Sequence, residues 1–301
     1  MLKVHQLRQV AARSGARDIA NVEIDVLLTY LLQLFTEKGL MEHLAFKGGT
    51  MLRKMVFGPR GRLSTDLDFT KRSDIHLDDL TLMLLDALAV PYHDIEFRFD
   101  RDKDWYLTDE GSSAIPVCAH PENMKGVKIK LQISTREKPI LPVAPAKQFE
   151  QDFFRFLEFA PATIPSLTLE EAIAKKIRAA SQRSKIRDLH DLSQIGRAVM
   201  KQDLIRSLAV LELWGVGGPG LDYARFRDHL QNTKDYELGD LRNLLRKDQE
   251  PDLKGMIDGV CDRFRFLEKL TERERVLTAD DAKKHSAEAE ELIASLVGSL
   301  A

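Results

Sequence analysis

The segment from Phe46 to Asp68 constrains the fold of this 301-residue chain most, because it combines a Gly-Gly-Thr turn with an Asp-x-Asp pair. The short apolar run at residues 43–46 predicts a strand that ends at the glycines, and residues 51–57 predict the helix that follows. Alternating polar and apolar residues at 66–70 predict a second strand. We therefore expect the first part of the chain to contain a sheet with helices packed against it.

Two elements of this segment carry functional chemistry. Gly48, Gly49 and Thr50 follow a predicted strand and open a predicted helix, where backbone N–H groups can bind phosphate and Thr50 can cap the helix or contact a phosphate oxygen. Asp66 and Asp68 share one face of a predicted strand, with Cα atoms about 6.6 Å apart, so their carboxylates can hold Mg²⁺. Each element alone is more often structural. Their order in the sequence favours a nucleotide and metal site.

The loop before the first aspartate is also polar and basic. Arg60 and Arg62 precede Ser64 and Thr65, and guanidinium and hydroxyl groups suit contact with a triphosphate. A solvent-facing loop is an equally good interpretation of these residues. The segment matches neither the Walker A pattern nor the Rossmann fingerprint, so any nucleotide site here is of another kind.

The predicted elements change in character along the chain. Helices are predicted over the first 40 residues and over residues 77–90. Strands are predicted at residues 94–100, 114–118 and 127–134, and residues 153–159 fit either state. From Thr168 onward only helices are predicted, with later ones at residues 186–199, 202–213, 222–230, 236–246, 252–271 and 278–300. We therefore predict an α+β domain over residues 1–150 and a helical domain over residues 151–301.

The composition is that of an ordinary globular protein, with 44% hydrophobic and 31% charged residues. The net charge of −2 provides no overall attraction to nucleic acid. Cys118 and Cys261 form no CxxC motif, so neither a disulfide framework nor a zinc site is indicated. The chain start lacks the apolar core of a signal peptide, and no apolar run approaches the roughly 20 residues that span a bilayer. We expect a cytoplasmic protein without membrane contact.

A predicted helix that begins at Leu169 carries two adjacent lysines. Thr168 and Glu171 have the spacing of a capping box at its start. On a helical wheel counted from Leu169, Lys176 falls at about 340°, within the apolar stripe, and Lys175 at about 240°, outside it. Lys176 is therefore expected to meet an anionic ligand or a carboxylate, unless its stem packs while the ammonium reaches water.

The next predicted helix brings acidic residues to an apolar stripe made of Leu189, Leu192, Ile195 and Val199. Asp188 lies on that stripe and Asp191 at its edge, so Asp188 needs a partner, for which Lys176 and Arg183 are candidates. The alternative is a structural ion pair. Between residues 175 and 187 there are six basic residues and no acid, which favours contact with phosphates or an RNA backbone.

Taken together, these motifs resemble the AbiEii/MenT family of nucleotidyltransferase toxins. The first matching pattern is F-K-G-G-T-x-L with S-x-D-L-D-F, within residues 44–70. The second is K-I-x-L-x-I-S-x-R-E, within residues 127–137. The last is A-x-K-I-R-A-x-x-x-R-x-x-x-R-D-L-x-D-L, within residues 169–192. The patterns occur in the family's order, whereas the last 100 residues contain nothing diagnostic.

The resemblance implies an α+β fold with a DNA-polymerase-β-like nucleotidyltransferase core, in which helices flank a mixed sheet, followed by an α-helical C-terminal domain. It implies NTP and Mg²⁺ use, transfer of nucleotides to the tRNA 3′ end, a neighbouring antitoxin and phage defence. It assigns catalysis to Asp66, Asp68, Lys176, Asp188 and Asp191, with the first two as metal ligands. It assigns nucleotide contact to Lys47, Gly48, Gly49, Thr50, Arg62, Ser64 and Arg183.

Two features depart from the family pattern. The segment between Thr50 and Asp66 is longer than is common, and Gln132 stands where related enzymes carry a third carboxylate. Glu137 could supply that charge, or two carboxylates could suffice. Two rival functions therefore stay open: a small-molecule nucleotidyltransferase on the same core, and a non-catalytic protein that binds a nucleotide or a partner.

Overall fold

The structure is a computed structural model that describes residues 1–100, 102–108, 111–197 and 199–299. The chain forms two compact units. Unit 1 comprises Met1–Pro139, Val143–Leu167 and Asn243–Gln249, and unit 2 comprises Ile140–Pro142, Thr168–Arg242 and Glu250–Ala301. The division thus differs from the predicted one at residue 150, because residues 151–167 belong to unit 1 and a short later segment returns to it.

Unit 1 is built on a mixed sheet, which confirms the predicted fold class. Within the described residues the sheet has the strand order β4-β5-β8-β2-β1-β10-β9. Its strands are β1 (Leu44–Lys47), β2 (Asp66–Lys71), β4 (Trp105–Thr108), β5 (Gly111–Ala114), β8 (Lys130–Ser134), β9 (Ala144–Ala146) and β10 (Ile164–Ser166). The pairs β2–β8 and β1–β10 are parallel and the others antiparallel. β10 lies beside β1, which explains why residues 151–167 belong to this unit.

A second, three-stranded sheet has the order β3-β6-β7. It contains β3 (Glu96–Arg98), β6 (Val117–His120) and β7 (Asn123–Lys128). The strands predicted at 114–118 and 127–134 were wrong as single strands, because each divides between the two sheets. Pro116, which has no N–H to donate to a ladder, lies at the first break. Its carbonyl accepts from the Ile129 N–H at the second break (3.0 Å).

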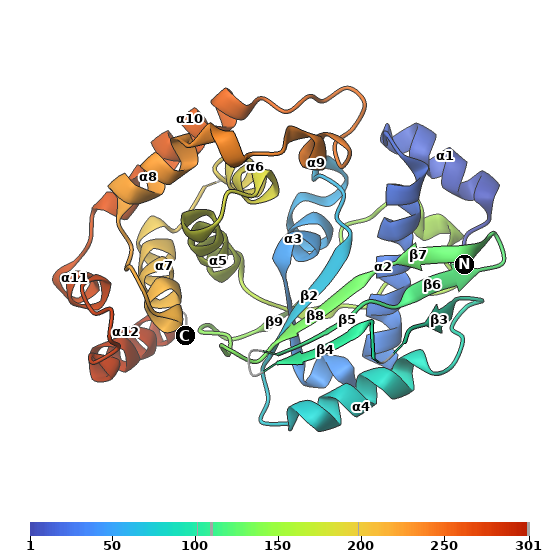
Figure 1. Cartoon of the computed structure of the whole chain (residues 1–301), viewed down its shortest axis with the longest axis horizontal. Helices are drawn as coiled ribbons and strands as arrows, with labels where there is room; N and C mark the ends of the chain where they lie inside the picture. Colours follow the sequence, from blue (N-terminus) through green and yellow to red (C-terminus); the bar gives the residue numbers. More distant parts are fainter. Residues whose placement is uncertain (101, 109–110, 198, 300–301) are drawn as a thin grey trace. The chain divides into compact units, whose positions relative to one another are not determined.

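Helix α2 forms the core against the large sheet (Figure 1). The helices of unit 1 are α1 (Val4–Ser14), α2 (Ile19–Glu37), α3 (Gly48–Met51), its π-helical continuation (Leu52–Phe57) and α4 (Leu77–Leu88). Phe35 of α2 meets Phe69 of β2 edge to face, with ring centroids 6.1 Å apart. α1 packs on α2, and α4 packs on α2 and β5.

By length and composition α2 is apolar enough to cross a membrane, contrary to the expectation that no apolar run approaches that length. Most of it is buried within unit 1, however, and Asp18 caps its start by accepting from the Ala20 N–H (2.9 Å). A mostly apolar helix that is enclosed by protein has the character of a core helix.

Unit 2 is helical, as predicted. Its helices are α5 (Leu169–Gln182), α6 (Ile186–Ile195), α7 (Gln202–Val216), α8 (Tyr223–Gln231), α9 (Leu238–Arg242), α10 (Leu253–Arg263), α11 (Glu272–Thr278) and α12 (Ser286–Gly298). Short 3₁₀ turns occur at Leu40–Glu42, Gly58–Arg60, Phe154–Phe156, Thr233–Asp235 and Arg265–Glu268 in the two units. The helix predicted at 252–271 divides into α10 and a 3₁₀ turn, and the helix predicted at 278–300 begins only at Ser286.

The start of α5 differs in one detail from the predicted capping box. The Thr168 hydroxyl accepts from the Glu171 N–H (3.3 Å), as expected. The Glu171 carboxylate, however, accepts from the backbone N–H groups of Ile140 and Leu141, both at 3.0 Å. Glu171 therefore anchors the segment 140–142 to unit 2.

Candidate functional site

The two aspartates of β2 face away from the core. Leu67 and Phe69, which alternate with them, are almost fully buried against the other side of the sheet. Asp68 pairs in register with Lys47 of β1 and with Gln132 of β8. Directly opposite residues on neighbouring strands lie close enough for their side chains to interact. The sheet therefore places Gln132 beside Asp68, in the position where the resemblance leads one to expect a third carboxylate.

Gly48 lies directly against the Asp68 carboxylate. Its φ angle is +81°, which disfavours any residue with a side chain. A Cβ atom built on Gly48 would overlap the carboxylate and lie 2.9 Å from the Asp68 Cβ. The close approach of turn and strand thus requires glycine here, and it brings the backbone of the turn next to the predicted metal ligand.

Gly49 is equally close to the loop that precedes β2. A Cβ atom built on it would lie 2.6 Å from the Arg62 Nη2 and 3.5 Å from the Ser64 Oγ. Arg62 is buried, and its Nη1 donates to the Leu63 carbonyl (3.1 Å). A guanidinium held beside a glycine turn concentrates positive charge where an anion could meet backbone N–H groups.

Thr50 links the turn to the same loop from inside the fold. Its side chain is buried, its Oγ1 lies 2.7 Å from the Ser64 Oγ, and it donates to the Asp66 carbonyl. In this structure Thr50 therefore holds the helix, the loop and β2 together. This internal bonding is a second role beside the nucleotide contact implied by the resemblance.

The loop has a further support that the sequence did not indicate. The Leu63 N–H donates to the carbonyl of Leu244, in the returning segment Asn243–Gln249 (2.9 Å). The same segment pairs with the connection between α1 and α2, where Lys247 N–H donates to the Gly15 carbonyl (2.8 Å). No motif marks residues 243–249, so only the three-dimensional structure assigns them this positioning role.

In unit 2, Lys176 lies between two acids, as predicted from the helical wheel. Its Nζ is 2.7 Å from Asp188 Oδ1 and 2.8 Å from Asp191 Oδ2. Arg183 reaches the other oxygen of Asp188 (2.9 Å). Burial alone would raise the pKa of Asp188, but the charges of Lys176 and Arg183 and their hydrogen bonds more than offset it, so the pKa lies below its usual value.

Lys175 lies outside the stripe that carries Lys176, as the helical wheel predicts, but it is buried all the same. Its side chain is 11% exposed, as buried as that of Lys176 at 12%, and it contacts Glu212 of α7 (2.6 Å). Arg178 contacts the other oxygen of Glu212 (2.8 Å). Four of the six basic residues in the segment 175–187 are therefore engaged by buried carboxylates of unit 2, which reduces the charge available to an RNA backbone.

The predicted stripe of α6 also ends earlier than expected. Leu189, Leu192 and Ile195 are buried, whereas Val199 is fully exposed. The helix ends at Ile195, and Gly196 follows it. The stripe of α6 therefore comprises three residues.

Comparison with known proteins identifies the family. The profile of the nucleotidyl transferase AbiEii toxin family, Type IV TA system, matches residues 30–280. The chain belongs to this family. Family membership makes it a nucleotidyltransferase toxin of a type IV toxin–antitoxin system, with a nucleotide substrate and an antitoxin partner. The non-catalytic alternative is thereby set aside.

Among solved structures, the AbiEii-family chain is similar to MenT4, a nucleotidyltransferase toxin from Mycobacterium tuberculosis H37Rv. The two share 25% sequence identity and a TM-score of 0.81 over 98% of this chain and 99% of the other. JHP933 from Helicobacter pylori matches at 19% identity and a TM-score of 0.49, over 90% of this chain and 98% of that protein. No curated protein matches the sequence significantly.

The predicted site residues of this AbiEii-family protein form one group in each unit. The group in unit 1 consists of Lys47, Gly48, Gly49, Thr50, Arg62, Ser64, Asp66 and Asp68. The group in unit 2 consists of Lys176, Arg183, Asp188 and Asp191. Among the described residues no cluster of three or more histidine, cysteine or acidic side chains forms a metal centre. Asp66 and Asp68 nevertheless supply the hard oxygen ligands that suit Mg²⁺.

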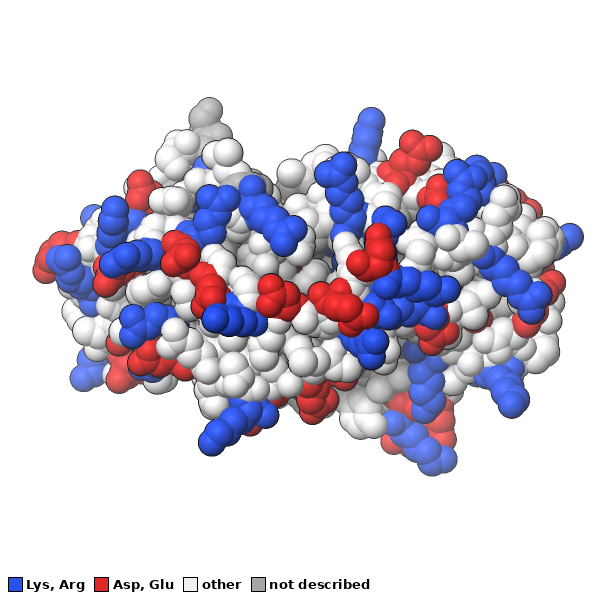
Figure 2. All heavy atoms as spheres, turned by 90° about the horizontal axis from the view of Figure 1, so that it is seen from above, with Lys and Arg blue, Asp and Glu red and all other residues white. Residues whose placement is uncertain are grey.

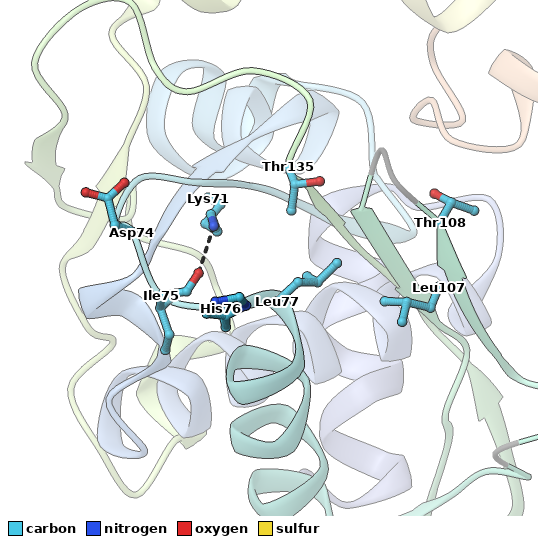
Figure 3. Close-up of a pocket in the computed structure, with 8 residues that line it drawn as sticks. All are labelled: Lys71, Asp74, Ile75, His76, Leu77, Leu107, Thr108 and Thr135. Carbon is cyan, nitrogen blue, oxygen red and sulfur yellow. Dashed lines mark hydrogen bonds between the residues drawn. The ribbon is translucent and has the colours of Figure 1, made fainter.

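A cavity of about 470 Å³ lies at the end of β2, where Lys71 lines it (Figure 3). Lys71, which alternates in β2 with the two aspartates, donates there to the Ile75 carbonyl (2.7 Å). His76 and Leu107 also line it. Because Lys71 points to the opposite face from Asp66 and Asp68, this cavity is separate from the candidate active site.

Proposed function

We propose that this AbiEii-family toxin transfers a nucleotide from an NTP to the 3′ end of tRNA and thereby blocks translation. The observation that carries the proposal is the contact of Gly48 with the Asp68 carboxylate beside Gly49 and Arg62. It joins a phosphate-binding turn, a buried guanidinium and a pair of carboxylates in one small volume of unit 1. These are the parts that phosphoryl transfer requires.

In the proposed reaction, the oxygen of the acceptor hydroxyl attacks the α-phosphorus of the NTP. The bond to the bridging oxygen of the β-phosphate breaks, and pyrophosphate leaves. Asp66 and Asp68 would hold Mg²⁺, which when bound neutralises developing charge on the phosphate oxygens. The turn at Gly48 and Gly49, together with Arg62, would bind and orient the triphosphate, so that catalysis comes mainly from positioning and electrostatics.

The resemblance assigns Lys176, Asp188 and Asp191 to the same reaction. Their mutual contacts support a role as one ion-pair cluster rather than as three independent groups, because Lys176 is within 2.8 Å of both acids. In this proposal the two carboxylates hold the ammonium in one position, and Arg183 fixes Asp188 from its other oxygen. Loss of any one member would then displace the others.

A small-molecule nucleotidyltransferase is the second candidate. It is favoured by the burial of Lys175, Lys176 and Arg178 in ion pairs, which removes much of the expected basic surface. On the face shown in Figure 2, basic and acidic side chains are interspersed over the surface. An RNA acceptor would therefore have to be recognised by few phosphate contacts, and the salt dependence of its binding would be shallow.

The decisive experiment supplies each α-³²P-labelled NTP with Mg²⁺ and either total tRNA or a mixture of aminoglycosides. We expect label in tRNA with the wild type and none with Asp66→Asn or Asp68→Asn, because each change removes a charged metal ligand. Circular dichroism checks that both variants are folded. Label in the small molecules and not in tRNA would replace the proposal by the second candidate, and full activity of both variants would reject the metal site.

We further propose that the protein acts in the cytoplasm, where tRNA and NTP are available, and that it protects a bacterial population against phage. The proposal rests on the toxin–antitoxin family alone. Efficiency of plating on cells that carry the toxin with its antitoxin, compared with cells that carry Asp68→Asn, measures the effect. Equal plating on both strains for a panel of phages would refute a defence role.

A further inference from the structure

A second cavity of about 470 Å³ lies within unit 1, away from the sheet face that carries Asp66 and Asp68. It is bordered by α1, α2, the helical segment after Gly48, residues 150–155 and the returning segment 243–249. Its volume is in the range of sites that hold small molecules. No motif of the sequence analysis refers to it.

A buried ion cluster that includes two wall residues, Arg53 and Asp25, contains two cations and one anion. Arg53, which lines the cavity, is 5% exposed, and its neighbour Lys54 is 1% exposed. Both depend on one carboxylate, that of Asp25, at 3.4 Å from the Arg53 Nη2 and 2.8 Å from the Lys54 Nζ. Two buried cations that share one buried anion leave a net positive charge, which is costly in a desolvated site unless an anion balances it.

The pKa values of this cluster agree with its geometry. Burial alone would raise the pKa of Asp25, but the charges of Lys54 and Arg53 outweigh burial and lower it. Burial lowers the pKa of Lys54 even though Asp25 opposes the shift. Lys54 Nζ donates to the Asp25 carbonyl, the Asp25 Oδ1 and the Thr29 Oγ1, so it occupies part of the one carboxylate that Arg53 shares.

Arg53 also has a donor without a partner. Its Nη1 donates to the Gly58 carbonyl, and its Nη2 donates to the Gln151 Oε1 (2.9 Å). Its Nε is buried and has no hydrogen-bond partner among the described residues. Buried polar groups are nearly always satisfied, so an orphaned guanidinium N–H beside a cavity indicates an acceptor that occupies that cavity.

The other charges that line the cavity are more exposed. Arg13 pairs with Asp152 (3.5 Å), Arg155 stacks on the Phe156 ring (4.6 Å), and Arg246 also lines the wall. Arginines outnumber acids in the lining, and guanidinium groups bind phosphate oxygens with good geometry.

We propose that this cavity is a binding site for a small phosphate-bearing molecule, with Arg53 as its buried anchor. The site borders the candidate nucleotide site through one loop, because Pro59 and Leu63 line the cavity while Arg62, in the same loop, contacts Gly49. It is distinct from that site, because none of Gly48, Gly49, Asp66 and Asp68 is among the described residues that line it. The inference does not depend on the proposed function.

Calorimetry and thermal unfolding of the full chain test the proposal. Inorganic phosphate, pyrophosphate and CMP are titrated in EDTA at constant ionic strength, with acetate as a carboxylate probe. We expect saturable binding of at least one phosphate probe and a rise in Tm with its concentration. A comparison of the affinities for inorganic phosphate and for CMP shows whether the site binds a free anion or the phosphate of a nucleotide. Absence of saturable binding for every phosphate probe, or equal binding of acetate, would overturn the proposal.

Variants locate the site. Arg53→Lys keeps the charge but removes the Nε donor, and it should weaken binding by about tenfold or more. Arg265→Gln, a change at an exposed arginine of unit 2, is the matched control and should leave affinity unchanged. Arg62→Gln removes the guanidinium of the candidate nucleotide site, and binding should persist. Loss of binding in Arg62→Gln with full binding in Arg53→Lys would refute the site.

If Arg53→Lys fails to fold, the exposed lining residue decides the question. Arg155 is an exposed residue of the cavity lining, so the variant Arg155→Gln should fold normally. Weaker phosphate binding in this variant, with Arg265→Gln unaffected, supports the proposal. Unchanged affinity in Arg155→Gln would contradict it.

Discussion

Replacing Gly48 by alanine is the sharpest test of the candidate active site. The residue has φ = +81°, and an alanine there adds a steric cost of about 1–2 kcal/mol from the backbone alone. The new Cβ would also lie 2.9 Å from the Asp68 Cβ and 3.0 Å from its Cγ. Carbon atoms pack at about 3.5–4.0 Å, so Asp68 would have to retreat by roughly 0.5–1 Å.

Gly39→Ala separates the two effects. Gly39 has nearly the same φ of +78°, but the nearest atom to its built Cβ is the Glu42 Oε1 at 3.9 Å, an ordinary contact. Both variants should therefore lose about 1–2 kcal/mol of unfolding free energy from backbone strain. Gly48→Ala alone should displace the carboxylate, and misplacement on this scale can lower the rate of nucleotide transfer by about 10²-fold.

The assay is the initial rate of label transfer from α-³²P-NTP at saturating Mg²⁺, with unfolding free energies from urea titration. The expected result is a rate near wild type for Gly39→Ala and a strongly reduced rate for Gly48→Ala at similar stability. If Gly48→Ala were stable and transferred label at the wild-type rate, the contact between the turn and Asp68 would have no part in the reaction.

Three further predictions follow from the buried polar contacts. Lys175→Met should destabilise the protein by about 2–4 kcal/mol, as Lys176→Met should, because each leaves a buried carboxylate with one cation fewer; urea titration would contradict this if only Lys176→Met were destabilised. Thr50→Val should cost about 2 kcal/mol by breaking its bonds to the loop at Ser64 and to β2, and an unchanged urea midpoint would refute it. The folded pKa of Asp188 is lowered, so its contribution to the free energy of unfolding is present above the unfolded pKa of about 3.9 and is lost as pH falls through the folded value. The free energy of unfolding should therefore fall less steeply with decreasing pH in Asp188→Asn than in the wild type. Equal slopes in the two proteins would contradict this prediction.

The local sequence pattern was sufficient to predict an element and the direction of its side chains where one face of that element is buried and the other is not. Strand β2 is such a case, because Leu67 and Phe69 pack inward and the alternation alone assigns the aspartates to the opposite face. The strands around Pro116 were mispredicted for a different reason. Alternation continues smoothly through the breaks, and the transfer of the chain from one sheet to the other is decided by pairing partners distant in the sequence.

The helical wheel of α5 placed Lys175 outside the apolar stripe but did not indicate its burial or its partner, because the wheel describes a single buried face. α5 packs against both α6 and α7, so its Lys176 side meets Asp188 and its Lys175 side meets Glu212. Glu212 is 37 positions away in the sequence, and nothing near Lys175 indicates it. A lysine outside the apolar stripe can thus be buried, because a second helix supplies its counter-charge.

The neighbours of Asp68 bear on how a metal ion would enter the proposed site. Gln132 on one side is neutral and Lys47 on the other is basic, so the sheet offers Asp66 and Asp68 no third carboxylate in register. Mg²⁺ is usually bound by one or two carboxylates together with substrate phosphates. In the proposed reaction the triphosphate, held by the glycine turn and Arg62, would supply the missing negative charge. Metal and nucleotide would then bind together, because each completes the site for the other.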